Sequence, residues 1–182
     1  KTNMKILFIV TFFKLALGDL YAQTSFYDLS IVTVSGEVVN FFFFFCKKVL
    51  IIVASPGALK SKIAARYFGK LQSQYPDVSV LILPLDIGMD SSSVIENEVY
   101  PLLSNSRFSV LVKAGKDKTL ETGTLLNWLT HGNNNKHFTK DIMSNEQYYV
   151  ISESGELYAV LEKGVSDVFL KEVLTAPDVV FH

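Results

Sequence analysis

One stretch of the chain, residues 47–75, constrains the fold more than any other. Residues 49–54 form an unbroken apolar run rich in Val and Ile, which is typical of a strand buried on both faces. After a tight turn, apolar residues recur every three or four positions up to Pro76, which predicts a helix over residues 59–75. In an α/β sheet, ligands and catalytic groups usually gather at such a turn. The turn here holds Pro56, Gly57 and Ala58, none of which can act as nucleophile, acid or metal ligand.

The rest of the pattern predicts the α/β fold class, with a central mixed sheet flanked by helices. Parallel strands come first and an antiparallel hairpin with a turn at residues 153–156 comes late. In the final helix we expect Val168, Phe169 and Val173 to face inward. The expected strands are residues 49–54, 78–83, 108–112, 148–151 and 157–161, and the expected helices are residues 59–75, 94–103, 125–129 and 167–174.

Composition narrows the chemistry. The 182 residues suit one domain, and the net charge of −1 argues against nucleic-acid binding. A single cysteine, Cys46, excludes an intrachain disulfide, a CxxC pair and a cysteine-built zinc site. Because Cys46 precedes the strand at residues 49–54, it lies at the end of the sheet opposite the turn, where we expect a small buried apolar residue. The spacing of His131, His137 and Asp141 fits no known metal geometry, so we expect no metal and no cofactor.

Residues 1–22 have the character of a targeting segment. A basic start, an apolar run over residues 6–17 and the small residue Ala22 are typical of a secretory signal peptide. The run is shorter than the roughly 20 residues that a membrane span needs, and Lys14 interrupts it. Two interpretations stay open. Either the segment is cleaved and residues 23–182 form a domain in the secretory pathway or outside the cell, or it is retained and associates with a membrane.

Five consecutive phenylalanines form the most unusual segment of the chain. In a strand their rings would alternate between two faces, and both faces would need cover, whereas a loop or short helix could tuck them against the core. Rings left outside would form an apolar patch suited to a partner. We therefore expect at least one of them to contact another chain, a lipid or a retained N-terminal segment. The candidate interface is Phe41, Phe42, Phe43, Phe44 and Phe45.

Six segments, in order and at similar spacing, resemble the glutathione peroxidase family. The resemblance spans about residues 24–175 and implies a thioredoxin-like fold. The short stretch between residues 128 and 140 is similar to that of monomeric members. The segments are SFYDLS (25–30), SGEVV (35–39), KKVLIIVAS (47–55), LILPLDIG (81–88), HFTK (137–140) and YYVISESGELYAVLEKGVS (148–166).

The catalytic residues of that family are absent from the matching positions. Its peroxidatic Cys or selenocysteine falls on Gly57, its Gln on Ile87, its Trp on Lys136 and its Asn on His137. Peroxide reduction in this family needs a thiolate or selenolate nucleophile, so the resemblance implies a catalytically inactive member that serves as a structural or interaction subunit. Two alternatives stay open: a thiol peroxidase of atypical design that uses Cys46 or a partner's thiol, and a carrier of small molecules or lipids in the vacated pocket.

Overall fold

A five-stranded sheet organises the computed structural model, which describes residues 24–33, 36–59, 62–85, 110–111, 121–142 and 146–178. Its strand order is β5-β4-β3-β6-β7, and a separate two-stranded sheet pairs β1 with β2. The strands are β1 (Ser30–Val32), β2 (Val38–Asn40), β3 (Lys48–Ala54), β4 (Val78–Pro84), β5 (Val110–Leu111), β6 (Glu146–Ile151) and β7 (Leu157–Glu162).

The pairing of the central strand confirms the predicted mixed α/β architecture. Strand β3 runs parallel to β4, from Lys48 beside Val78 to Ala54 beside Pro84. On its other side β3 runs antiparallel to β6, which continues into β7 as the predicted hairpin. All seven residues of β3 are buried, which explains the apolar run that has no alternation.

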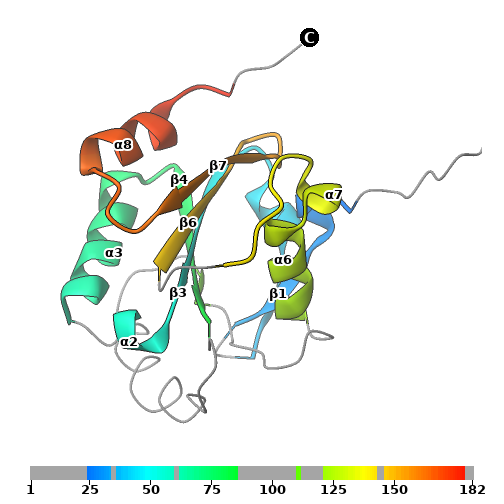
Figure 1. Ribbon diagram of the computed structural model, residues 1–182, viewed down its shortest axis with the longest axis horizontal. Coiled ribbons are helices and arrows are strands. Elements are labelled where there is room, and N and C mark those ends of the chain that lie inside the picture. Colours follow the sequence, from blue (N-terminus) through cyan, green and yellow to red (C-terminus); the bar gives the residue numbers. More distant parts are fainter. Residues whose placement is uncertain are drawn as a thin grey trace, which may run out of the picture.

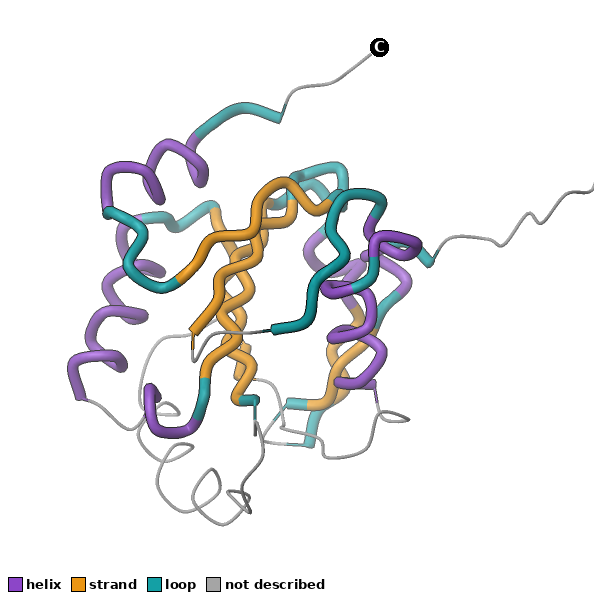
Figure 2. The backbone as a smooth tube through the Cα atoms, viewed as in Figure 1, coloured by secondary structure: helices purple, strands orange, loops and turns teal. Residues whose placement is uncertain are grey.

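Helices cover both faces of the sheet (Figure 1). Helices α3 (Lys62–Gln74) and α8 (Asp167–Thr175) lie on one face, and α6 (Glu121–Thr130) lies on the other with β1 and β2. The pleat of β3 divides the core accordingly, because Val49, Ile51 and Val53 pack into one apolar cluster and their neighbours along the strand into the second. Figure 2 shows the strands enclosed between these helical layers.

The described helices agree with the sequence prediction in part. Helix α3 covers most of the helix expected over residues 59–75, a short α2 (Pro56–Leu59) precedes it, and residues 60–61 lie outside the described residues. A further short helix, α7 (Gly132–Asn135), is absent from the helices that the sequence predicts. The helix expected over residues 94–103 lies outside the described residues, as do residues 1–22. Within the described part of the chain, no helix has the length and apolar character needed to cross a bilayer.

The inward face of α8 was predicted correctly for Val173, which is half-buried against the core, and wrongly for Val168 and Phe169. Val168 is 69% exposed and Phe169 is 48% exposed, whereas Leu170 and Leu174 are buried. Ser166 caps the helix, since its hydroxyl oxygen accepts a hydrogen bond from the Phe169 amide. The phase of the helix places Leu170 and Leu174, one turn apart, against the core. Five of the nine residues of α8 are apolar, and Val168, Phe169 and Leu170 are consecutive, so the sequence alone did not define that phase.

Candidate functional site

The turn that follows β3 has room for a side chain at Gly57 but holds no thiol. The Ser55 carbonyl accepts hydrogen bonds from the amides of Ala58 and Leu59, at 3.0 and 3.1 Å, and thereby shapes the first turn of α2. Gly57 is exposed, and a Cβ atom built there would meet no atom within 4 Å. The described residues of this turn therefore contain no thiol side chain. Nor do the described residues include a cluster of three His, Cys, Asp or Glu side chains that could hold a metal ion.

Two of the other positions that match the peroxidase motif, Lys136 and His137, are described by the structure and lie apart from Gly57. Ile87 is outside the described residues. His137 is exposed, and the Lys136 amine lies 3.8 Å from a carboxylate oxygen of Glu156. Glu156 belongs to the turn between β6 and β7, at the end of the sheet where Lys48 begins β3, while Gly57 follows the opposite end of that strand. The structure therefore does not gather Gly57 and Lys136 into one site.

A buried amide that the sequence analysis missed holds this region together. Asn135 is 2% exposed, and its side-chain amide donates hydrogen bonds to the carbonyls of Trp128, Leu129 and Phe138, at 2.8, 3.1 and 2.9 Å. Its oxygen accepts hydrogen bonds from the amides of His137 and Phe138 at 2.9 and 2.7 Å. All the polar capacity of this buried side chain is thus used in joining α6, α7 and the segment after α7. The only hint in the sequence was the run of three asparagines.

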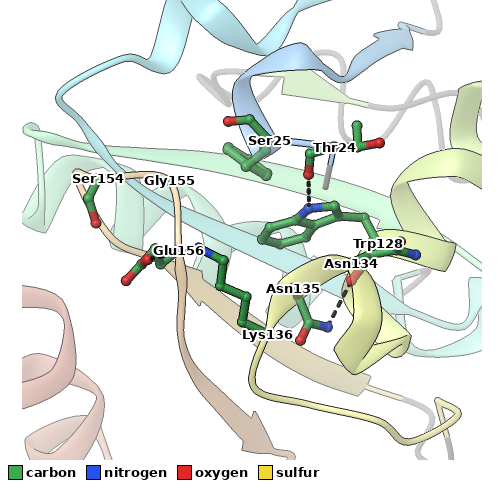
Figure 3. Close-up of a pocket in the computed structure, with 10 residues that line it drawn as sticks. Thr24, Ser25, Trp128, Asn134, Asn135, Lys136, Ser154, Gly155 and Glu156 are labelled. Carbon is green, nitrogen blue, oxygen red and sulfur yellow. Dashed lines mark hydrogen bonds and ion pairs between the residues drawn. The ribbon is translucent and has the colours of Figure 1, made fainter. Parts of the chain in front are cut away.

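A small pocket of about 260 Å³ opens beside this network (Figure 3). The indole N–H of Trp128 donates a hydrogen bond to the Thr24 carbonyl at 3.0 Å, and the side chain of Lys136 extends toward Glu156 across the pocket. Ligand pockets usually exceed about 300 Å³, and this one lies at the end of the sheet away from Gly57. It is lined by Thr24, Ser25, Phe26, Trp128, Asn134, Asn135, Lys136, Ser154, Gly155 and Glu156.

The five phenylalanines form a short 3₁₀ helix, η2 (Phe41–Phe44), and one residue beyond it. Asn40 caps η2, because its side-chain oxygen accepts a hydrogen bond from the Phe42 amide at 2.8 Å. Phe41 and Phe44 are buried, and the ring of Phe41 lies 4.7 Å from that of Phe26 in the core. The short-helix interpretation is therefore confirmed for Phe41–Phe44, whereas its expected burial holds for two of the five rings.

The remaining three rings form an exposed surface that we call the Phe patch: Phe42, Phe43 and Phe45. Their exposed fractions are 66%, 74% and 53%. The rings of Phe42 and Phe45 stack with centroids 5.5 Å apart, and Phe45 meets the edge of Tyr27 at 5.3 Å. These contacts fix two of the rings side by side on a capped turn. The patch is therefore a defined surface at the amino end of β3.

Cys46 is exposed, which corrects the expectation that it is buried. Its backbone has a φ of 58°, in the left-handed region, because the chain reverses between η2 and β3. That reversal points the residue outward before burial begins at Lys48. Cys46 does lie at the end of the sheet opposite Gly57, as predicted, so its thiol cannot serve the turn after β3.

The tyrosines near these regions act as hydrogen-bonding or packing groups. Burial, reinforced by the charge of a Cys46 thiolate, raises the pKa of Tyr27 to about 12, and its hydroxyl donates to the Glu153 carbonyl at 2.6 Å. Burial also raises the pKa of Tyr148 and Tyr149, and the Tyr148 hydroxyl donates to Glu146. Groups with raised pKa values of this kind stay protonated at neutral pH, so none of them is suited to act as a base.

Comparison with known proteins defines the fold class. No protein-family model matches the sequence, and no curated protein sequence matches it. Among solved structures, MTB dsbF aligns with a TM-score of 0.57 at 13% identity, covering 84% of this chain and 97% of that chain. The exposed lipoprotein thioredoxin Etrx1 from Streptococcus pneumoniae strain TIGR4 gives a TM-score of 0.56 at 16% identity, covering 80% of this chain and 97% of that one. Trgpx in its apo form aligns with a TM-score of 0.54 at 14% identity, covering 83% of this chain and 93% of that chain.

These similarities establish that the chain has a thioredoxin-like fold. Identities of 13 to 16% show the fold alone and carry no statement about activity. The fold class expected from the sequence is therefore confirmed, and a membership of the glutathione peroxidase family is not established by these neighbours.

Proposed function

We propose that this chain is an interaction protein on a thioredoxin-like fold, a catalytically inactive relative of the glutathione peroxidases that binds a protein partner through the Phe patch. The observation that supports it is the distribution of chemistry along β3. Gly57 stands after the carboxyl end of the strand, where the resemblance expects the nucleophile, and exposed aromatic rings gather at the amino end. The chemistry expected of the fold is missing while an unusual surface is present.

The size of the Phe patch is suited to a binding site. The three exposed fractions, 66%, 74% and 53%, applied to rings of about 200 Å² each, leave roughly 390 Å² of aromatic surface in water. The largest apolar patch on a typical monomer is about 300–600 Å² and is often functional. Aromatic residues also supply much of the energy at interfaces, since they carry large contact area at low entropic cost. The patch is therefore large enough to anchor one partner.

A thiol peroxidase that uses Cys46 is the second candidate function, because the side chain is exposed. A nucleophilic thiol normally needs a neighbouring base or cation that lowers its pKa. Lys47 supplies a cation beside Cys46, but no histidine that could act as the base is among the residues lining the groove that contains Cys46. We therefore place the peroxidase activity second to the interaction role.

We also propose that the domain works in the secretory pathway, outside the cell or at a membrane. The signal-like character of residues 1–22 supports this location. One protein with the same fold is an exposed lipoprotein thioredoxin. N-terminal sequencing of the secreted protein tests the interpretation, with cleavage expected after Ala22. We expect the folded domain to be a monomer in the absence of its partner.

Two measurements test the proposed function. Steady-state assays with hydroperoxide and either glutathione or thioredoxin should show no turnover above background. A rate that Cys46→Ser abolishes would establish the peroxidase instead.

For the partner, a photo-crosslinking amino acid at Phe43 in cells that make the protein should trap a neighbouring protein that the same amino acid at Phe169 does not trap. That neighbour, once purified, should bind the wild-type chain and lose affinity for Phe43→Ser.

A further inference from the structure

A groove of about 650 Å³ continues from the Phe patch across the amino ends of β3 and β4 to the end of α3. Phe43 belongs to both surfaces, so a ligand that covers the patch can extend into the groove. The volume is within the usual range of about 300–1,000 Å³ for ligand sites. A ligand that packs its apolar part on the Phe patch can therefore also make polar contacts in the groove.

Among the exposed charged side chains of the groove, negative charges outnumber positive charges by one. The carboxylates of Asp77 and Glu153 and the amine of Lys47 line the groove and are exposed. None of the three forms an ion pair with another described residue. A ligand with a positive group therefore complements this end of the surface.

Lys48 also lines the groove, but its charge is already committed. The side chain is 4% exposed, and its amine donates to the Ala176 carbonyl, lies 3.7 Å from a carboxylate oxygen of Asp178 and stands over the Tyr158 ring at 5.3 Å. Removing the amine from these partners would cost more than a new exposed contact returns. Lys48 thus leaves the excess of negative charge on the groove unchanged.

The groove does not offer a strand edge for pairing at its β4 side. The side-chain amide of Gln72 donates to the Val78 carbonyl at 3.1 Å and accepts from the Val80 amide at 3.3 Å. These are the two backbone groups that a paired strand would use at that position. A ligand is therefore held there by side-chain contacts and not by addition of a strand.

The surface also disfavours two other occupants. Anionic lipid headgroups would meet the carboxylates of Asp77 and Glu153. A second copy of the chain would bring the same carboxylates toward each other, and about 390 Å² of exposed rings is well below the roughly 800 Å² per partner of a stable interface. A short segment of another protein needs neither a large area nor a matching copy.

Resting on the proposed interaction role, we propose that the partner presents a segment with an aromatic or branched apolar side chain close to a lysine or arginine. The apolar side chain packs on the Phe patch at Phe43. The cation reaches the carboxylates of Asp77 and Glu153 in the groove. The recognised feature is thus an apolar anchor followed or preceded by a basic residue.

Selection of short random peptides displayed on phage, with the full folded protein as bait, tests this inference. Peptides that combine an apolar anchor with a basic residue should be enriched. Synthesised individually, they should bind Phe43→Ser about tenfold more weakly, as expected when an interface anchor is lost. The double variant Asp77→Asn with Glu153→Gln should also weaken binding, and added salt should weaken the wild-type interaction. Phe169→Ser and Glu172→Gln, exposed residues on α8, are the matched controls and should leave binding unchanged.

The outcomes separate this inference from the proposed function. Peptides that depend on Phe43 but bind the double carboxylate variant equally well would overturn the inference and leave the interaction role standing. Peptides indifferent to both variants, or vesicle co-sedimentation or self-association that Phe43→Ser abolishes, would overturn the inference together with a protein partner at this surface. Melting curves of each variant confirm that the fold is intact.

Discussion

Replacement of Asn135 by alanine should destabilise the domain more than any single surface change. Its side chain makes five hydrogen bonds, to the carbonyls of Trp128, Leu129 and Phe138 and from the amides of His137 and Phe138. Each is worth about 0.5–1.5 kcal/mol net, and some of the stranded backbone groups can reach water, so we expect a loss of about 3 kcal/mol. For a chain of this size that loss corresponds to a fall of about 6–12 °C in melting temperature.

A second variant at the same position identifies the cause. Asn135→Asp keeps the two acceptor contacts but turns a carboxylate toward three carbonyl oxygens. The pKa of the new carboxyl should therefore be raised in the folded state. Since the unfolded chain ionises at the lower, ordinary pKa, this variant should be most stable at acidic pH and should lose stability as the pH rises through the interval between the two values.

Thermal unfolding followed by circular dichroism, at acidic and at neutral pH, measures both effects. Asn133→Ala is the matched control, because Asn133 lies on the same helix and is exposed, so its replacement should change stability by less than about 0.5 kcal/mol. A melting temperature of Asn135→Ala within about 2 °C of the wild-type value would show that the Asn135 hydrogen bonds contribute little to stability. An aspartate variant as stable at neutral as at acidic pH would contradict the raised pKa of the new carboxyl.

Three further predictions follow from burial and backbone geometry. Phe44→Ser should lower the free energy of unfolding by about 3–5 kcal/mol, because Phe44 is 6% exposed, whereas Phe43 is 74% exposed and Phe43→Ser should change it little. Denaturant unfolding measures both variants, and equal effects would contradict the assignment of Phe43 to the exposed patch. Gly155→Ala should destabilise the domain by more than about 1 kcal/mol, because the φ of Gly155 is 81° and the added Cβ would lie 2.5 Å from the Tyr27 ring. Gly57→Ala is the control, since its added Cβ would meet no atom within 4 Å. Because burial raises the pKa of Tyr27 from 10.0 to about 12, stability should fall as the pH rises across that interval, and Tyr27→Phe should reduce the slope measured by chemical denaturation.

Sequence patterns were sufficient for the core of the fold. The apolar runs identified the two central strands, and their parallel pairing follows from the helical pattern between them. The late hairpin was predicted from two apolar segments around the turn that contains Gly155. These features depend on local propensity and burial, which the order of residues encodes directly. The absence of a nucleophile at Gly57 was likewise visible without coordinates.

Tertiary structure decided which side chains of the ambiguous segments face water. Nothing in five identical phenylalanines shows that Phe42, Phe43 and Phe45 are exposed, because that choice depends on the phase of η2 against Phe26. The same holds for α8, where Leu170 faces the core and Phe169 does not.

The exposure of Cys46 and the burial of Asn135 and Lys48 also required the assembled chain. Cys46 is turned outward by a left-handed backbone, and Asn135 is buried because groups from α6 and the segment after α7 converge on it. Lys48 is buried because residues 176–178, far along the sequence, return to its amine. Local sequence specifies the pattern of strands and helices, but contacts between distant segments determine which polar groups are satisfied inside and which apolar rings remain outside.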